Sequence, residues 1–520
     1  MIKTALIYTL PDECSIAQFI QRLQAIVDLQ VGVVTEIRKS YYDSFDWRLY
    51  HAGMVLEFSQ SAAGGSLSLL NLDYPQALMS ADISQVPVFA SDFESTDFRL
   101  QLTPILAMRA LFEVGAVNFS VTPINVLNQD AKTIFRLRIE ASKVLATRIV
   151  IQIIKGYDKE VLAIINKLQA EFDLLPETQA LFVQVLALHA KFPGDYQPKL
   201  KLHFNPQLRA VVALAQIYKH LTGVLQRNHA GCIHNWDSEF VHDFRIAVRS
   251  TRVGLGRCKK IFPKQLLAEF IQFFSWLGKI TGPVRDLDVY LLQFESYQAL
   301  LPVANREHLE PLRELLQHKQ QQAYQELAQH LQSEYYCDSM GRWQAFLDAP
   351  PSDQSAAPQA KWSVKQWADR KIWKTYKQVM NTAQVLSSDS PEEEWHDLRK
   401  SMKKLRYLIE FFQSVYPKAE MKQALKLLKF WLSSLGELQD LAVQIQTLRT
   451  LGEEQAADGA TSASLQAIAL LIDTLTQRQQ AARQVLNDNI KSFSRAKNHR
   501  HFTRLFAPQK QYLSLDEDDE

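Results

Sequence analysis

The sequence predicts an α+β multidomain protein, with an N-terminal antiparallel sheet or barrel and a C-terminal all-α domain of two pseudo-symmetric helical bundles. Residues 2–154 contain runs of β-branched and aromatic residues, separated by turns such as Ala63-Gly64-Gly65. From about residue 205 onward the apolar residues follow a helical period. Within that part, residues 241–289 match residues 395–443 at a shift of 154 positions and without a gap. Such a match indicates a duplicated structural unit.

The first domain is predicted to span residues 1–195. Residues 2–9 predict a strand, and residues 15–28 predict an amphipathic helix with Ser15 as its N-cap. Further strands are predicted at 31–43, 53–60, 66–73, 98–104, 109–121 and 133–154. Residues 158–190 return to a helical period, and the Pro and Gly residues at 193, 194 and 198 mark the boundary.

The second domain is predicted to span residues 205–508, in halves of about 205–345 and 362–508. Its helices are predicted at 206–227, 238–260, 264–279, 285–300, 306–335, 362–384, 391–413, 418–434, 438–451 and 463–495. A Pro/Ser/Ala stretch from Ala349 to Pro358 is expected to connect the halves. Residues 509–520 end in DEDDE and are expected to form an acidic disordered tail.

Charge is distributed unevenly along the 520 residues, although the net charge is only +2. Residues 1–200 hold 17 Lys and Arg against 21 Asp and Glu, whereas residues 201–520 hold 41 against 35. Five of those 35 acidic residues form the terminal run, so the body of the second domain is basic and favours an anionic partner. The four cysteines are widely spaced and match neither a disulfide framework nor a metal site. With no signal peptide and no apolar run of about 20 residues, we expect a cytoplasmic protein without a membrane partner.

The repeated polar residues are cations at helical spacing. Positions 0, 3, 7 and 10 of each copy fall on one stripe of a helix. The first copy places His242, Arg245, Arg249 and Arg252 on that stripe, and the second places His396, Arg399, Lys403 and Arg406 there. Like charges at this spacing weaken an isolated helix. We therefore expect each stripe to bind an anion that neutralises it.

Other interpretations of these residues are open. Each histidine either donates a hydrogen bond to an anion or orients its neighbours. The dipeptides His242-Asp243 and His396-Asp397 are also found in metal phosphohydrolases, but the arginines that follow would repel a divalent cation. Asp286 and Asp440 occupy equivalent positions and are expected to orient arginines rather than to catalyse a reaction.

The second domain resembles the CHAD family, the conserved histidine α-helical domain. The resemblance rests on VHDFRIAVRSTR and WHDLRKSMKKLR, on GPVRDLDV and GELQDLAV, and on KLRYLIEFF. It implies two pseudo-symmetric helical bundles around a basic groove that binds inorganic polyphosphate. The implied ligand-facing residues are His242, Arg245, Arg249, Arg252, His396, Arg399, Lys403 and Arg406, with Lys400 and Lys404 as neighbours.

The first domain is similar, less closely, to the CYTH family of triphosphate tunnels. The segment SYYDSFDWRLYHAGMVLEF (40–58) carries this resemblance. The family's first strand carries Glu-x-Glu-x-Lys, which holds a metal and phosphate, whereas residues 3–8 read KTALIY, without a carboxylate. Residues 51–98 contain neither Lys nor Arg, and Arg109, Arg136 and Arg138 are interpreted as remnants of the site. These departures predict a degenerate tunnel-like domain with no catalytic residue, metal site or cofactor.

Together these observations predict a bacterial or archaeal protein that binds inorganic polyphosphate without catalysis. The main alternative is a metal-dependent inorganic triphosphatase whose N-terminal site differs from the family pattern. Nucleic acid is a less favoured partner, since no spacing of aromatic residues requires base stacking.

Overall fold

The computed structural model describes residues 5–73, 77–258, 260–349, 359, 361–387, 390–493 and 496–507. The chain divides into two compact units, Met1–Gln197 and Pro198–Glu520. The predicted acidic tail and nearly all of the predicted connector between the halves lie outside the described residues.

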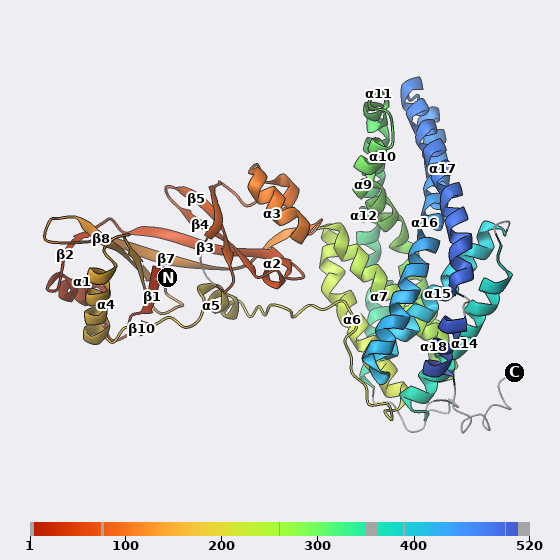
Figure 1. Ribbon diagram of the computed structural model, residues 1–520, viewed down its shortest axis with the longest axis horizontal. Coiled ribbons are helices and arrows are strands. Elements are labelled where there is room, and N and C mark those ends of the chain that lie inside the picture. The colour runs from red at the N-terminus through yellow and green to blue at the C-terminus, as the bar shows by residue number, and fades with distance from the viewer. Residues whose placement is uncertain are drawn as a thin grey trace. The chain divides into compact units, whose positions relative to one another are not determined.

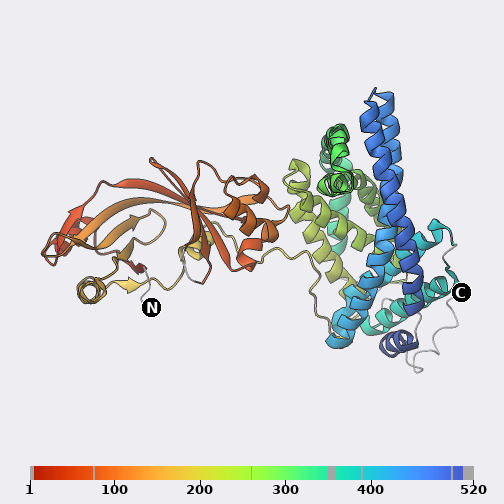
Figure 2. The same cartoon turned by 45° about the horizontal axis from the view of Figure 1, so that its top comes forward.

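The first unit is built on one antiparallel sheet of ten strands (Figure 1). The strands are β1 (Ala5–Thr9), β2 (Asp28–Val31), β3 (Thr35–Ser44), β4 (Met54–Ser61), β5 (Gly64–Asn71), β6 (Ala77–Asp82), β7 (Leu111–Leu127), β8 (Thr133–Ala141), β9 (Arg148–Ile153) and β10 (Leu175–Pro176). Their order is β10-β1-β9-β8-β7-β3-β4-β5-β6, and β2 pairs with the end of β7. The long strand β7 joins β3 to β8, and the sheet curves strongly around it (Figure 2).

Helices cover the two faces of this sheet differently. On one face, α1 (Ile16–Gln24) and α4 (Asp158–Phe172) pack on apolar residues of β1, β7, β8 and β9. On the same face, α3 (Thr96–Leu106) packs on β4 and β5 beside the short α2 (Arg48–His51). On the opposite face, α5 (Leu181–Leu188) packs against Tyr41 and Phe119. Because side chains alternate along a strand, α5 shares its face with Glu57 and Glu140.

Two strand predictions are wrong. The segment 98–104 lies within α3, because Phe98, Leu102 and Leu106 are buried at a spacing of four, which is a helical period. The single strand predicted at 133–154 is two strands, β8 and β9, which pair with each other.

The second unit is helical. Its first half contains α6 (Ala210–His234), α7 (Ser238–Arg257), α8 (Lys264–Ile280), α9 (Gly282–Leu292), α10 (Phe294–Ala299), α11 (Val303–Arg306), η2 (Glu307–Leu309), α12 (Glu310–Leu331) and α13 (Glu334–Asp348). Its second half contains α14 (Val364–Val385), α15 (Glu392–Phe412), α16 (Lys418–Ala457), α17 (Ser462–Phe493) and α18 (Ala496–Phe506). None of the described helices combines the length and apolarity needed to cross a membrane.

The two copies differ where one proline stands. In the first copy α8 ends at Ile280 and α9 begins at Gly282, followed by Pro283. Proline lacks the N–H that continues a helix, and its ring clashes with the preceding turn. The equivalent residue in the second copy is Glu437, and α16 runs through it without a break. The helix boundary predicted between 434 and 438 is therefore wrong.

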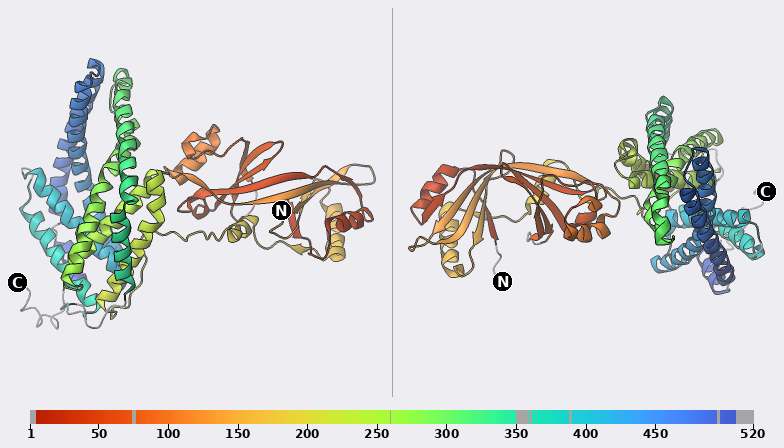
Figure 3. Two further views of the ribbon diagram at one scale, coloured as in Figure 1. Left: turned by 180° about the vertical axis from the view of Figure 1, so that it is seen from behind. Right: turned by 90° about the horizontal axis from the view of Figure 1, so that it is seen from above.

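Both halves contribute to one hydrophobic core at the end of the unit where α9, α12, α16 and α17 project together (Figures 1 and 3). The first half supplies Tyr290, Phe294, Tyr297, Leu301, Leu309, Leu312 and Leu316. The second half supplies Leu441, Ile445, Leu448, Leu451, Ala467, Ile468, Leu471 and Leu475. This shared core ties the second half to the first.

Candidate anion-binding site

Helices α7 and α15 carry the two copies of the repeated motif. Helix α7 begins after Asp237, whose carboxylate accepts a hydrogen bond from the backbone N–H of Glu239 at 2.9 Å. Helix α15 begins after Pro391 and has three glutamates in its first turn. Negative charge at this end of a helix interacts favourably with the helix dipole and stabilises the helix. The buried side of α7 includes Phe240, Val241, Phe244, Val248 and Leu255, and that of α15 includes Trp395, Leu398, Met402, Leu405 and Leu408. The cationic positions therefore lie on the side of each helix that does not pack in the hydrophobic core.

The cationic stripes of the two helices approach each other. Helix α7 contacts α15. Burial, followed by the charges of Arg399 and of Arg249 from the other helix, lowers the pKa of Lys403 to about 8. Arg249 and Lys403 occupy equivalent positions of the two copies, so equivalent charges of the two halves act on each other. Cations held this close repel one another, and a bound anion would relieve the repulsion.

In the first half, Arg245 is held by backbone and hydroxyl oxygens. Its Nη1 donates to the carbonyl of Gly278 at 3.0 Å and to Oγ1 of Thr281 at 3.3 Å. Burial and the neighbouring Arg249 lower the pKa of Arg245. The Nη1 atom of Arg252 lies against Gly278, where a Cβ atom would be only 2.7 Å away. Gly278 of α8 thus makes room for the guanidinium group of Arg252.

The sequence prediction missed Arg285, at the start of α9. Its Nη1 is buried and has no hydrogen-bond partner in the described part of the chain. Burial and the charge of Arg285 together lower the pKa of His242, which favours a neutral imidazole there. A signal for Arg285 was present, because it stands inside the repeated segment 282–289, at the position equivalent to Gln439.

In the second half, carboxylates hold the cations. Arg399 Nη2 lies 3.0 Å from Asp440 Oδ1, and the aspartate side chain is 63% exposed. This pair bears out the expectation that Asp440 orients an arginine. Arg406 pairs with Glu410 at 3.3 Å, and Lys400 pairs with Asp397 at 3.0 Å. Arg399, Lys400 and Arg406 therefore each have a carboxylate partner. The buried Nε atoms of Arg399 and Arg406 nevertheless have no hydrogen-bond partner in the described part of the chain.

The two histidines have different surroundings. His396 Nδ1 lies 2.6 Å from Oε1 of Gln439, which fixes the orientation of the ring. His242 has Arg285 at the equivalent place instead. The hydrogen bond of His396 shows an orienting contact, while a bond from either imidazole to an anion remains a prediction.

The remaining predicted lysines lie at the edge of the stripe. Lys400 and Lys404 are exposed on α15. Burial and the charge of Arg257, the last residue of α7, lower the pKa of Lys404. Positive charge therefore continues from the centre of the stripes toward the C-terminal end of α7. Among the described residues, no three His, Cys, Asp or Glu side chains are placed to hold a metal ion.

Equivalent glycines lie beside equivalent arginines in the two halves. A Cβ atom at Gly282 would lie 3.4 Å from Nη1 of Arg245, and one at Gly436 would lie 3.6 Å from Nη2 of Arg399. Both distances are ordinary van der Waals contacts, so each glycine lies directly beside the equivalent guanidinium of its own half.

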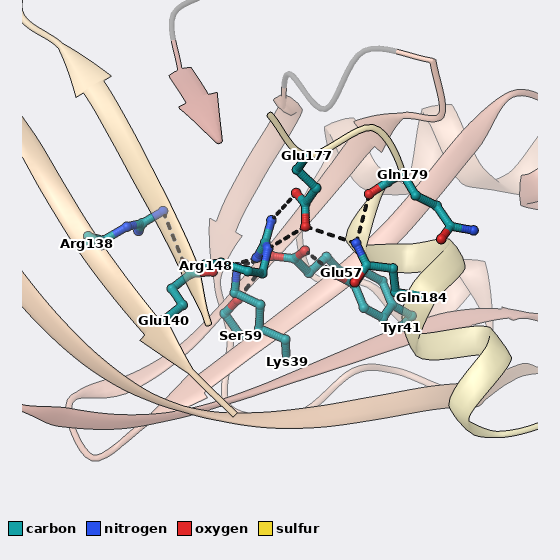
Figure 4. A network of polar contacts seen from close by, with 10 residues as sticks. All are labelled: Lys39, Tyr41, Glu57, Ser59, Arg138, Glu140, Arg148, Glu177, Gln179 and Gln184. Atoms are coloured by element: carbon teal, nitrogen blue, oxygen red, sulfur yellow. Dashed lines mark hydrogen bonds and ion pairs between the residues drawn. The ribbon is translucent and has the colours of Figure 1, made fainter. Parts of the chain in front are cut away.

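The first unit contains a separate network of charges on the face that α5 covers (Figure 4). Glu140 is buried and contacts Arg148 at 2.6 Å, Lys39 at 3.7 Å and Arg138 at 3.6 Å. Arg148 also contacts Glu177 at 2.8 Å.

Glu57 completes this network. It accepts a hydrogen bond from Tyr41 at 2.9 Å and lies 3.7 Å from Lys39. Gln184 of α5 donates to Glu177 at 2.9 Å, which ties the covering helix to the same charges. Every carboxylate of the network contacts a cation, and the three carboxylates balance Lys39, Arg138 and Arg148. A divalent metal would have to displace these cations, so the network does not fit a metal site.

The arginines interpreted as remnants of a phosphate site are divided. Arg138 belongs to the network, and Arg136 lies exposed two residues before it on the same face of β8. Arg109 is buried and contacts Asp46 at 3.4 Å, away from the network. The sequence prediction missed Lys39, Glu57, Glu140, Arg148 and Glu177, which come from four strands and the segment after β10.

Comparisons with known proteins agree with the repeated motif. A family model described as the CHAD domain matches residues 216–449. No curated protein sequence matches the chain significantly. Among solved structures, a CHAD domain from the plant Ricinus communis is 25% identical, covers 60% of this chain and 97% of its own, and has a TM-score of 0.48.

Other solved structures match parts of the chain. PptA from Streptomyces chartreusis is 13% identical, covers 55% of this chain and 99% of its own, and has a TM-score of 0.43. A putative adenylyl cyclase from Hippeastrum, described as having a dominant triphosphatase activity, is 10% identical, covers 37% of this chain and 99% of its own, and has a TM-score of 0.28.

Proposed function

Since this chain contains a CHAD domain at residues 216–449, we propose that it binds inorganic polyphosphate without catalysis. The polyanion lies in a basic groove between the two duplicated halves. The observation that carries this proposal is the approach of the stripes of α7 and α15, which brings Arg249 and Lys403 together. Polyphosphate has a negative charge at each phosphate, and successive phosphates can be gripped by successive guanidinium groups.

The residues proposed to contact the polymer are those of the two stripes, their neighbours and Arg285. They are His242, Arg245, Arg249, Arg252, Arg285, His396, Arg399, Lys400, Lys403, Lys404 and Arg406. Arginine supplies paired donors in a fixed geometry, whereas lysine acts as a mobile point charge. The buried, unpartnered Nη1 of Arg285 supports adding this residue, because an unsatisfied buried donor is costly until an acceptor arrives.

We propose that the first unit, within residues 1–195, is a degenerate CYTH-like domain. Support comes from its internal charge network, in which Glu57, Glu140 and Glu177 are all paired with cations. Helix α5 covers the same face with apolar side chains. A face already neutralised and covered is poorly suited to a triphosphate and its metal.

Binding is tested by combining Arg249→Ala with Lys403→Ala in the full chain. Removing the two central cations should weaken polyphosphate binding by about 3 kcal/mol, or more than a hundredfold, because each charged contact contributes about 1.5–3 kcal/mol. Calorimetric titration with polyphosphate at fixed salt measures this change.

The matched control combines Lys319→Ala with Arg342→Ala. It removes two cations from the same unit that are paired with Glu454 and Glu269, far along the chain from the stripes. The control should bind like the wild type. Equal affinity of the central double variant and the wild type would refute the proposed site. Stronger competition by RNA than by polyphosphate at matched salt would point to a nucleic-acid partner instead.

A further inference from the structure

We propose that the two halves of the site grip a phosphate chain unequally and that the α7 half is the stronger anchor. This inference rests on the polyphosphate-binding function proposed above. It follows from four of the positions at which the two copies differ, each close to a cation or histidine of the stripe. Elsewhere the second copy carries Lys400 and Lys404, exposed at the edge of the stripe, where the first has Ile246 and Ser250.

The first two differences lie beside Arg245 and its equivalent, Arg399. Gly278 and Thr281, whose oxygens hold Arg245, correspond to Leu432 and Leu435 in the second copy. Leu435 lacks the hydroxyl that Thr281 offers, and the side chain of Leu432 fills space that Gly278 leaves open. Arg399 contacts the exposed carboxylate of Asp440 at 3.0 Å instead. The equivalent Asp286 forms no ion pair within 4.0 Å in the described part of the chain, although its charge acts on Arg245.

The third difference lies one helical turn after Arg252 and Arg406. Glu410 follows Arg406 by four residues and pairs with it at 3.3 Å. The equivalent of Glu410 in the first copy is Gly256, which supplies no carboxylate. Arg252 is exposed, and its guanidinium rests against Gly278 without an ion-pair partner among the described residues.

The fourth difference adds a cation to the first half. Arg285 corresponds to Gln439, so the first half has a guanidinium where the second has a neutral amide bonded to His396. The buried Nη1 of Arg285 has no partner in the described part of the chain.

These differences change what an incoming phosphate must displace. In the α15 half a phosphate competes with Asp440 for Arg399 and with Glu410 for Arg406. In the α7 half, Arg252 and Arg285 form no ion pair within 4.0 Å among the described residues, although the charges of Asp286 and Asp288 act on Arg285. Arg245 donates only to neutral oxygens. Donors that are not already neutralised give a larger net gain when they meet an anion. A short phosphate chain should therefore occupy the α7 half first.

The decisive variant is Gly256→Glu, which copies the carboxylate of the second half into the first. The position is exposed, and a Cβ atom there would meet nothing within 4 Å, so the fold should accept the change. The new carboxylate lies four residues after Arg252, in the geometry of the Arg406–Glu410 pair. The matched control is Gly256→Gln, which has the same length without the charge.

Calorimetric titration of the full chain with tripolyphosphate measures the effect. We expect Gly256→Glu to weaken binding about two- to fivefold relative to Gly256→Gln, as a competing surface ion pair would. Glu410→Gln should strengthen binding. Arg252→Gln should weaken binding about tenfold, and Arg406→Gln should weaken it less.

The outcomes separate this inference from the function on which it rests. If the wild type binds neither tripolyphosphate nor long polyphosphate, the proposed function fails and takes the inference with it. If the wild type binds but Gly256→Glu and Gly256→Gln have the same affinity, the inference alone is overturned. A larger loss of tripolyphosphate affinity in Arg406→Gln than in Arg252→Gln would also overturn it, because the α15 half would then bind more strongly.

Discussion

Lys403 shows how closely packed positive charges destabilise the site when no anion is bound. Its ammonium group is partly buried beside Arg399 and Arg249, and its pKa falls to about 8. Holding the charge there costs free energy because solvent no longer screens the neighbouring guanidinium groups. A phosphate beside Lys403 would favour the charged form and raise the pKa again.

Proton linkage at Lys403 predicts a pH-dependent affinity. Below pH 8 the lysine is charged with or without ligand, so affinity should stay constant. Above pH 8 the free lysine is neutral and must take up a proton to bind, so affinity should fall by up to about tenfold per pH unit. Titration calorimetry between pH 7 and 10 measures this fall. The Lys403→Arg variant should not show this fall in affinity, since arginine stays charged. Identical pH profiles for the variant and the wild type would contradict the attribution of the fall to Lys403.

Arg148 is the residue on which the network of the first unit depends. It joins buried Glu140 on β8 to Glu177 after β10. Arg148→Gln leaves two carboxylates without their closest cation and should reduce local stability by about 3 kcal/mol or more. Hydrogen–deuterium exchange of the amides of β8 and β9 measures this loss. Arg138→Gln is the control, because Arg138 is 52% exposed and its pair with Glu140 should contribute about 0–1 kcal/mol.

The residues that the sequence identified are those that the two copies share. Arg245, Arg249, Arg399 and Lys403 could be recognised because they repeat at helical spacing. Arg285 was missed because its equivalent is the neutral Gln439, although it lies inside the repeated segment 282–289. The network of the first unit could not be predicted either, since Lys39 and Glu140 meet only through strand pairings across β7.

At the scale of the helices, the crossing of α6 and α7 depends on a glycine. A Cβ atom at Gly231 would lie 2.2 Å from the ring of Phe240, which begins the buried side of α7. The two helices can approach this closely only because Gly231 has no side chain. The cationic stripe of α7 therefore depends on a residue that carries no charge.

Substitution at this crossing is expected to destabilise the unit that contains the site. Gly231→Ala should lower the free energy of unfolding by about 1–3 kcal/mol, because the added methyl group overpacks the contact. Gly223 lies in the same helix, and a Cβ atom there would meet nothing within 4 Å. Gly223→Ala should raise stability by about 0.5–1 kcal/mol, as alanine favours a helix. Scanning calorimetry compares the two variants, and equal effects would contradict the packing argument.

Periodicity predicted the type of an element correctly where the periodic segment was long, and the prediction was wrong where the segment was short. Helices α7, α14 and α15 lie close to their predicted bounds, because each repeats its apolar spacing over several turns. The segment 98–104 is too short for β-branched and aromatic content to distinguish a strand from a helix. The run 418–457 is one helix because Gly436 alone does not end a helix, whereas Gly282 followed by Pro283 does.

For the whole molecule, the charge network of the first unit predicts no triphosphatase activity. The full chain mixed with tripolyphosphate and Mg²⁺ or Mn²⁺ should release phosphate at the rate of the buffer alone. The physical reason is that Glu57, Glu140 and Glu177 are each occupied by a lysine or arginine. A colorimetric phosphate assay checks this, and metal-dependent turnover that disappears in Glu140→Gln would establish the enzyme instead.

The jointly built core of α9, α12, α16 and α17 has a consequence for how the duplicated chain can change. Two identical subunits must accept every substitution twice, once on each side of their twofold axis. In a single chain each copy can change independently, while apolar packing between the copies holds them together in space. A leucine can then replace a threonine in one copy while the equivalent residue of the other copy stays polar. The two halves can therefore keep the same fold and still bind an anion with different strength.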